Sequence, residues 1–347
     1  MHQGILLTAD YHDENCVIRR RDLSRSTEDV VTVPTTEGDL LAVLADARRR
    51  AGARGRVVWL QESTTGWARV RDLVGQKAEF VLANVLQMPL PPKGRRQKTD
   101  KVDTARLQRE YLNGELPRAH QPPAWWRQVR RVVACRENLV SRRTALRNGI
   151  NRYLAHETWA DRLGLWSVKG ARRLRSIAAK LPPRDRLVMT LKLDELAALE
   201  AQQTAVEAEL QAIYQECADA RRLDAVRGIG VVSAVSIVAR IGPIGRFRNA
   251  EHLIAFAGLA PGVRQSDGTR RDGRIGGGGT DEHLRHYLIE ASVWARQLPR
   301  YKATYDRVAK RRGKKVGRIV VARLLLRSID KVLRDGVAFT PEATVAA

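Results

Sequence analysis

The fold of the N-terminal region depends on an apolar run, GILLTAD at residues 4–10, which ends in the carboxylate of Asp10. An uninterrupted apolar run of this length predicts a strand that is buried on both faces. Residues 55–62, GRVVWLQE, repeat the pattern and end in Glu62. Each of these strands is therefore expected to deliver an acid at its carboxyl end.

The elements around these two strands follow an order that is typical of an α/β domain. Three strands come first, and helices and strands then alternate, which predicts a mixed sheet in residues 1–118. The other expected strands are residues 17–18, 30–33 and 78–82, and the expected helices are residues 37–51 and 67–73.

A further acidic motif lies in the run QKTDKVDTAR at residues 97–106, which follows a proline-rich stretch and opens an expected helix. Asp100 and Asp103 are three positions apart, so both carboxylates point to one side of that helix. Lysine and arginine surround them, which suits a divalent cation beside a polyanion. Acids in a first helical turn can also simply complement the helix dipole. The run by itself leaves both readings open.

The four acids taken together favour a metal site. Ligands of α/β sheets usually bind at the carboxyl ends of the strands, where Asp10 and Glu62 are expected to meet Asp100 and Asp103. Four carboxylates repel one another unless cations offset their charge. Two magnesium ions about 3.5–4 Å apart would do so, and would clamp the attacking and leaving oxygens of a phosphate. We therefore predict that these acids hold magnesium.

The charge of the chain is its strongest bulk signal. Lysine and arginine number 62 against 38 acids, a net charge of +24. Residues 118–186 carry 17 basic and 4 acidic side chains, and residues 300–335 carry 13 and 3, so these segments hold almost all of the excess. Concentrated cations favour a nucleic-acid partner, because each phosphate that is neutralised releases counterions. A solvated basic surface is the alternative.

The cysteine and hydropathy patterns bear on where the protein works. No run approaches the roughly 18 apolar residues of a membrane helix, and no signal-peptide pattern opens the chain. Three scattered cysteines offer neither a disulfide framework nor a zinc knuckle. We therefore expect a reduced, cytoplasmic protein with no membrane partner.

Residues 119–222 are expected to form a basic helical and coiled-coil region. Arginines surround an apolar helical stripe there, and the candidates for nucleic-acid binding are Arg130, Arg131, Arg142, Arg143 and Arg147. Between Met189 and Cys217, mostly apolar residues recur at alternating spacings of three and four over four heptads. This spacing indicates a coiled coil. We favour a homodimer contact over an intramolecular hairpin, and leave open whether dimers pair into tetramers.

Residues 223–338 are expected to be a mostly helical third region. Gly228 and Gly230 form the Gly-x-Gly turn of a helix-hairpin-helix element, whose exposed N–H groups can reach a phosphate. A basic turn further along is a candidate contact to the nucleic-acid backbone, formed by Lys310, Arg311, Arg312, Lys314 and Lys315. Residues 339–347 are expected to be a disordered tail.

The same region contains a candidate nucleophile. Ser266 lies in an expected loop between Arg264 and Arg270. Cations on both sides would stabilise an attacking alkoxide and the transition state at a phosphodiester. The serine could equally be a turn residue ahead of the following Asp-Gly.

These motifs, in this order, resemble the DEDD-type insertion-sequence transposases of the IS-one-ten group, which are bridge-RNA-guided recombinases. Each piece is weak alone, but the ordered set is specific and covers nearly the whole chain. The matching pieces are strand-end Asp10, ESTTGW at residues 62–67, KTDKVDTA at residues 98–105, the glycine hairpin at residues 228–230, and GLAPGVRQS at residues 258–266.

The resemblance implies a RuvC-like, RNase H-type nuclease domain in which Asp10, Glu62, Asp100 and Asp103 hold magnesium. It also implies a coiled-coil middle region and a C-terminal transposase domain whose serine, Ser266 here, cuts and rejoins DNA through a covalent link. In such a protein an element-encoded bridge RNA pairs with donor and target DNA, while the protein grips the backbones.

Two departures from the family pattern affect individual residues. The family's first strand reads Gly-Ile-Asp-Val with a basic residue soon after, whereas residues 8–14 read TADYHDE. Asp13 and Glu14 are therefore rival candidates for the first metal ligand. Ser266 is followed by Asp-Gly rather than directly by glycine, which loosens its assignment.

The favoured function is a transposase that excises and inserts its own mobile element. A RuvC-like Holliday-junction resolvase or structure-specific nuclease is the first alternative, and it would need the four acids but no serine. A non-catalytic nucleic-acid-binding scaffold is the second, and it would need neither the acids nor magnesium.

Overall fold

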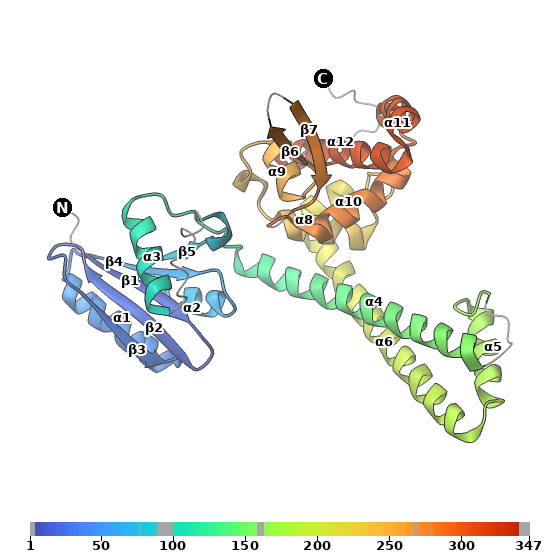
Figure 1. The fold of residues 1–347 in the computed structure, drawn as a ribbon, viewed down its shortest axis with the longest axis horizontal. Helices are drawn as coiled ribbons and strands as arrows, with labels where there is room; N and C mark the ends of the chain where they lie inside the picture. Colours follow the sequence, from blue (N-terminus) through green and yellow to red (C-terminus); the bar gives the residue numbers. More distant parts are fainter. Residues whose placement is uncertain are drawn as a thin grey trace. The chain divides into compact units, whose positions relative to one another are not determined.

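The computed structural model describes residues 4–75, 77–88, 100–157, 163–266, 269–277 and 279–339. For residues 100–101, 157, 262–266 and 269–274 it describes the backbone alone. The chain divides into two compact units, Met1–Gln121 and Pro122–Ala347 (Figure 1). Phe339, expected in the tail, is buried in the core of the second unit, and the rest of the expected tail lies outside the described residues.

The first unit is built on a five-stranded sheet with the strand order β3-β2-β1-β4-β5. β1 pairs antiparallel with β2 and parallel with β4, so the mixed sheet expected from the sequence is confirmed. An RNase H-like classification stays a prediction. The elements are β1 (Gly4–Tyr11), β2 (Asn15–Asp22), β3 (Glu28–Pro34), α1 (Glu37–Ala51), β4 (Arg56–Glu62), α2 (Trp67–Val74), β5 (Glu79–Ala83), a 3-10 turn (Val85–Gln87) and α3 (Asp100–Leu112).

Different helices cover the two faces of this sheet. Odd-numbered residues of the central strands, such as Leu7 and Trp59, pack in one cluster with α1 and α2. Even-numbered residues, such as Leu6 and Leu60, pack in another cluster with Leu107 of α3. Because side chains alternate along a strand, the parity of a residue in β1 or β4 indicates which helices it faces.

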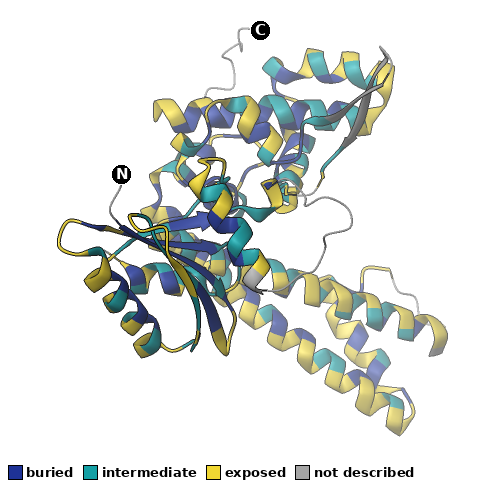
Figure 2. Cartoon of the chain, turned by 60° about the vertical axis from the view of Figure 1, so that its left-hand side comes forward, coloured by how far each residue is buried: buried dark blue, intermediate teal, exposed yellow. Residues whose placement is uncertain are grey.

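The second unit begins with two long helices that form a hairpin, α4 (Ala124–Glu157) and α6 (Pro183–Glu216), joined through α5 (Val168–Ala179). Two ion pairs show that they run antiparallel: Arg136 Nε lies 2.8 Å from Glu207 Oε1, and Arg147 Nη2 lies 2.6 Å from Glu200 Oε1. Figure 2 shows buried positions at intervals along both helices, between largely exposed ones.

The heptad residues of α6 pack against α4 and α5 within this hairpin. Its buried members include Met189, Leu199 and Leu210, which are at most 2% exposed. Met189 packs in a cluster with residues of α4 and α5, and Leu210 packs in one with Val129 of α4. The structure therefore has the intramolecular hairpin that we weighed as the alternative, and the heptad residues are not free for the expected dimer contact. A homo-oligomer formed through other surfaces stays a prediction.

The rest of the second unit is a helical body with one small β-hairpin. Its main core cluster centres on α8, α10 and α12, and takes in residues of α4 and α6. Residues 261–266, expected as part of a loop, form a strand that pairs antiparallel with residues 269–275. The elements are α7 (Ala218–Leu223), α8 (Val231–Ile241), a 3-10 turn (Ile244–Arg246), α9 (Ala250–Phe256), β6 (Pro261–Ser266), β7 (Thr269–Ile275), α10 (Glu282–Ala295), α11 (Pro299–Arg312) and α12 (Lys314–Asp335).

The hairpin can be tested by truncating its heptad. Leu199→Ala removes a side chain that is 2% exposed, and should lower the free energy of unfolding by about 2–5 kcal/mol because a cavity remains. Urea titrations followed by circular dichroism at several protein concentrations measure this loss. It should be the same at every concentration, because the contact lies within one chain.

Leu191→Ala on the same helix is the matched control. Leu191 is 60% exposed, so its truncation should change the free energy of unfolding by no more than about 0.5 kcal/mol. A loss in Leu199→Ala that grows on dilution would contradict the intramolecular hairpin and favour a dimer contact.

Candidate functional site

Asp10 and Glu62 lie side by side at the ends of neighbouring strands. Ala9 of β1 is paired with Gln61 of β4 in the parallel register, so the next position brings Asp10 beside Glu62. Both are even-numbered, which places them on the sheet face that α3 covers. The structure thus brings together two of the acids that the sequence singled out.

The other two acids belong to the helix on that same face. Asp103 is half-buried in α3, and the neighbouring Thr104 is fully buried. Further along α3, the side-chain amide of Gln108 donates to Glu28 Oε2 at 2.9 Å, which ties the helix to β3. Asp100 is the first residue of α3, and its side chain lies outside the described residues.

We call the α3-covered face of the sheet, with Asp10, Glu62 and the acids of α3, the acidic face. Its carboxylate oxygens are the ligands that a hard cation prefers. However, among the side chains that the structure describes, no three from histidine, cysteine, aspartate and glutamate gather as a metal-holding group. Asp10, which is 14% exposed, has its Oδ1 at 3.4 Å from Nε2 of His12. The rival ligands Asp13 and Glu14 are exposed in the turn between β1 and β2. Magnesium binding therefore stays a prediction.

Cys16 of β2 lies on the opposite side of the sheet from the acidic face. Its side chain is fully buried in the core on the α1 side of the sheet. Burial, and secondly the charge of Asp10, raise the pKa of the Cys16 thiol to about 12. Because the thiolate is the nucleophile and the metal ligand, Cys16 supplies neither at neutral pH.

The predicted nucleophile lies in the β-hairpin of the second unit. Ser266 is the last residue of β6 and pairs with Thr269 of β7, while Gln265 pairs with Arg270 and Arg264 with Arg271. The side chains of these residues lie outside the described ones. The structure thus places Ser266 at the tip of a hairpin, and its role stays a prediction.

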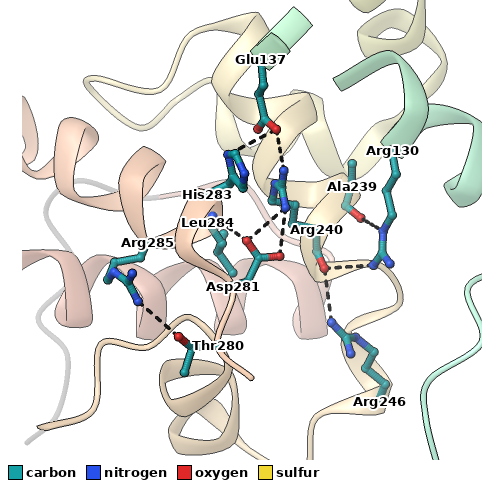
Figure 3. Close-up of polar contacts among 10 residues, drawn as sticks. All are labelled: Arg130, Glu137, Ala239, Arg240, Arg246, Thr280, Asp281, His283, Leu284 and Arg285. Atoms are coloured by element: carbon teal, nitrogen blue, oxygen red, sulfur yellow. Dashed lines mark hydrogen bonds and ion pairs between the residues drawn. The ribbon is translucent and has the colours of Figure 1, made fainter. Parts of the chain in front are cut away.

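The base of that hairpin is shaped by residues that sequence reasoning missed. Gly276 N donates to Gly258 O at 2.9 Å, which closes the base of the hairpin. The guanidinium of Arg285 lies against both glycines and donates to Thr280 Oγ1 at 3.3 Å (Figure 3). A Cβ on Gly258 would come within 2.3 Å of Arg285 Nη1 and 2.8 Å of Thr280 Oγ1. The glycines were visible in the sequence, but nothing there showed what fills the space beside them.

A polar network centred on Arg240 of α8 connects α4 to α10 (Figure 3). Arg240 lies 2.6 Å from Glu137 Oε2 and 3.1 Å from Asp281 Oδ1. Asp281 also accepts from the backbone N–H of Leu284 at 2.9 Å, which caps α10. His283 Nδ1 lies 3.3 Å from the same Glu137 oxygen. The network joins three helices that are far apart in the sequence.

Two arginines cap the last turn of α8 in the same region. Arg130 donates to the carbonyls of Ala239 and Arg240 at 2.7 and 3.0 Å. Arg246 donates to the carbonyls of Ile241 and Arg240 at 2.8 and 3.2 Å. Burial lowers the pKa of Arg130, and it lowers the pKa of Arg246 to about 10. Arg130, a predicted nucleic-acid contact, is thus engaged inside the protein.

The other predicted nucleic-acid contacts differ in their exposure to solvent. Arg147 pairs with Glu200 and lies over the Trp166 ring, and Arg142 lies 4.0 Å from Glu195. Arg143 is half-buried, whereas Arg131 is exposed. The basic turn between α11 and α12 is exposed at all five predicted positions: Lys310, Arg311, Arg312, Lys314 and Lys315.

The glycine turn before α8 is present as expected. Gly230 is the N-cap of α8, and Gly228 has a positive φ of 95°. A Cβ on Gly228 would come within 2.9 Å of both the Ala291 carbonyl oxygen and Trp294 Cβ. Only glycine fits there, so the turn packs directly on α10.

Comparison with known proteins supports a transposase relationship. Residues 220–306 match the family model described as "Transposase IS116/IS110/IS902 family". This region spans α8, the β-hairpin and α10, so it contains the glycine turn and all members of the Arg240 network except Glu137. No helix in the described part of the chain is long and apolar enough to cross a bilayer.

Several curated proteins are similar to this chain. A "Probable family 20 transposase" of Pseudomonas aeruginosa is 34% identical over 47% of this chain and 49% of its own length. The "Transposase for insertion sequence element IS1111A" of Coxiella burnetii is 32% identical over 38% of this chain and 37% of its own length. The "Putative transposase y4rJ" of Sinorhizobium fredii is 28% identical over 75% and 72%. The matches to the first two span about half of those relatives or less.

The packing at the hairpin base predicts the effect of a small substitution. Gly258→Ala should lower the free energy of unfolding by about 1–3 kcal/mol, because Gly258 has a positive φ and its added Cβ meets Thr280. Gly277→Ala is the matched control, since nothing lies within 4 Å of a Cβ there. Urea titration of both variants measures the difference. Equal stability of the two would show that Arg285 and Thr280 do not pack against Gly258.

Proposed function

We propose that this chain is a transposase of the IS110/IS116 group, which cuts and rejoins DNA to excise and insert its own mobile element. The observation that carries the proposal is the match of residues 220–306 to the transposase family model. The position of Asp10 and Glu62, each directly after the paired residues Ala9 and Gln61, supports it independently.

In the first unit we propose a magnesium site on the acidic face. Asp10, Glu62, Asp100 and Asp103 would hold the metal, in a RuvC-like, RNase H-type domain. Bound magnesium would polarise a phosphodiester and stabilise the charge of an attacking and a leaving oxygen. The support from this chain is the register of β1 and β4 and the position of Asp103 on α3.

In the second unit we propose that Ser266 attacks a DNA phosphodiester. Its Oγ would bond to phosphorus while the 3′ or 5′ oxygen of the broken strand leaves with a proton, and the reverse step would rejoin the DNA. The positive charge of Arg264 and Arg270 in the same hairpin would stabilise the transition state. The support is the position of Ser266 at the hairpin tip within the family match.

We further propose that donor and target DNA are chosen by an element-encoded bridge RNA. Base pairing would then select the sites, and exposed cations such as those at Lys310 and Lys315 would contact backbones without reading bases. Sequencing the RNA that co-purifies with the protein, from bacteria that carry the element with its flanking DNA, tests this. Absence of a discrete element-encoded species would contradict it.

The chemistry is tested with two variants in a recombination assay on a plasmid that carries the element. Ser266→Ala and Asp103→Asn should each lower recombination by about a hundredfold or more, because each removes a group that acts in the transition state. Glu37→Gln, at an exposed carboxylate in the first turn of α1, is the matched control and should recombine normally. DNA binding by each purified variant shows that it is folded.

The alternatives give different outcomes in the same assay. If Ser266→Ala recombines normally while Asp103→Asn is inactive, the serine step is wrong and a RuvC-like nuclease or resolvase is favoured. If Asp103→Asn and removal of magnesium both leave every activity intact, the chain is a binding scaffold.

A further inference from the structure

The helical hairpin of the second unit ends in a small head with its own core. α5 packs Leu174 and Ala178 against Ile150 of α4 and Met189 of α6, in a cluster separate from the main core of the unit. The N-cap Ser167 accepts from Gly170 N at 3.0 Å, which fixes the start of α5. This head therefore holds the outer face of α5 in a defined position.

The outer face of α5 carries cations without counter-charges. Lys169, Arg172, Arg175 and the following Lys180 are all exposed, and none of their side chains has an ion pair or hydrogen bond within the described part of the chain. Residues 163–190 contain seven lysines and arginines but one acid, Asp185, which is half-buried in the first turn of α6. These four cations form what we call the α5 patch.

Two arginines of α4 in the same hairpin, by contrast, form ion pairs with α6. Arg136 and Arg147 of α4 each have a glutamate of α6 within 2.8 Å. The charges of these two arginines are therefore neutralised within the hairpin. α6 supplies no such partner to the α5 patch. The cations of the α5 patch therefore differ from Arg136 and Arg147 in having no carboxylate partner from α6.

The α5 patch is electrostatically unfavourable in the isolated protein. The first turn of α5 has no acid and carries Lys169, so a cation sits at the positive end of the helix dipole. Like charges three positions apart on a helix also repel. Beside them, Leu163 and Val168 are 81% and 82% exposed. A polyanion with an apolar component would relieve both the charge repulsion and the exposure of these aliphatic side chains.

We propose that the α5 patch binds the phosphodiester backbone of nucleic acid, at a site distinct from the acidic face, the Ser266 hairpin and the basic turn between α11 and α12. Lys169, Arg172, Arg175 and Lys180 contact successive phosphates, and Leu163 and Val168 contact the sugars between them. The contact reads no bases, because lysine and arginine bound to phosphate carry no sequence information. The choice of nucleic acid as the polyanion rests on the proposed function.

The test uses the full chain and its variant Lys169→Gln/Arg172→Gln/Arg175→Gln. Fluorescence anisotropy with a labelled 30-base-pair DNA duplex and an RNA duplex of the same sequence, at several KCl concentrations, gives the affinity and its salt slope. The variant should bind at least about tenfold more weakly at 0.1 M salt, and its log–log slope should be shallower by about 2–3. The duplex that shows the larger change is the one that the α5 patch contacts.

The matched control removes the same charge elsewhere. Arg49→Gln/Arg50→Gln/Arg54→Gln alters exposed arginines on and after α1, and should keep the affinity within about twofold and the slope unchanged. Equal losses in both variants would mean that only net charge matters, which overturns the α5 patch as a site. Unchanged binding in the α5 variant overturns it as well.

A second measurement needs no variant. Acetylation of lysines in the wild-type protein, read by mass spectrometry, should slow at Lys169 and Lys180 when the duplex is bound, but not at the exposed Lys331 of α12. Equal rates with and without the duplex overturn the proposal. If the wild-type protein binds neither duplex, the proposed function fails too; if it binds both but the patch is not involved, only the α5 inference fails.

Discussion

The parallel pairing of β1 with β4 is the contact on which the first unit depends. Their register places Ala9 opposite Gln61 and so fixes Asp10 beside Glu62. A slip of one residue in either strand would move the acid of that strand to the face that α1 and α2 bury, because side chains alternate along a strand. The buried rows on both faces, with Leu7 and Trp59 on one side and Leu60 on the other, make such a slip costly. The hydrophobic core thus determines where the two carboxylates lie.

In the second unit, buried guanidinium groups play a comparable organising role. Taking a charge out of water costs several kcal/mol unless partners replace the solvent. Arg240 has two carboxylates, and Arg130 and Arg246 have the carbonyls at the end of α8. These contacts depend on the arrangement of α4, α8 and α10, because the partners of Arg240 come from α4 and from the N-cap of α10. The network therefore specifies how the start of the hairpin meets the body that carries Ser266.

The sequence predicted periodic elements well and long-range partners poorly. The strands that end in Asp10 and Glu62, and the helix that begins at Asp100, follow from local apolar pattern and were found. The heptad of α6 predicted a helical partner but could not say whether that partner was α4 or a second chain, because both bury the same side chains. Strand β6 was expected as part of a loop, because its residues do not show a regular alternation of apolar and polar side chains. Arg285 was missed because its place between two glycines exists only in the folded hairpin.

Partners that exist only in the folded chain also change how its charge is interpreted. A count of basic residues assumes that every lysine and arginine of residues 118–186 can bind a polyanion. In the structure Arg130 caps α8, and Arg136 and Arg147 neutralise glutamates. Only cations that keep their hydration and counterions in the free protein can release them on binding. The α5 patch meets this condition, as do Lys310, Arg311, Lys314 and Lys315 near the turn between α11 and α12. The salt dependence of nucleic-acid binding should therefore reflect far fewer contacts than the net charge of +24 suggests.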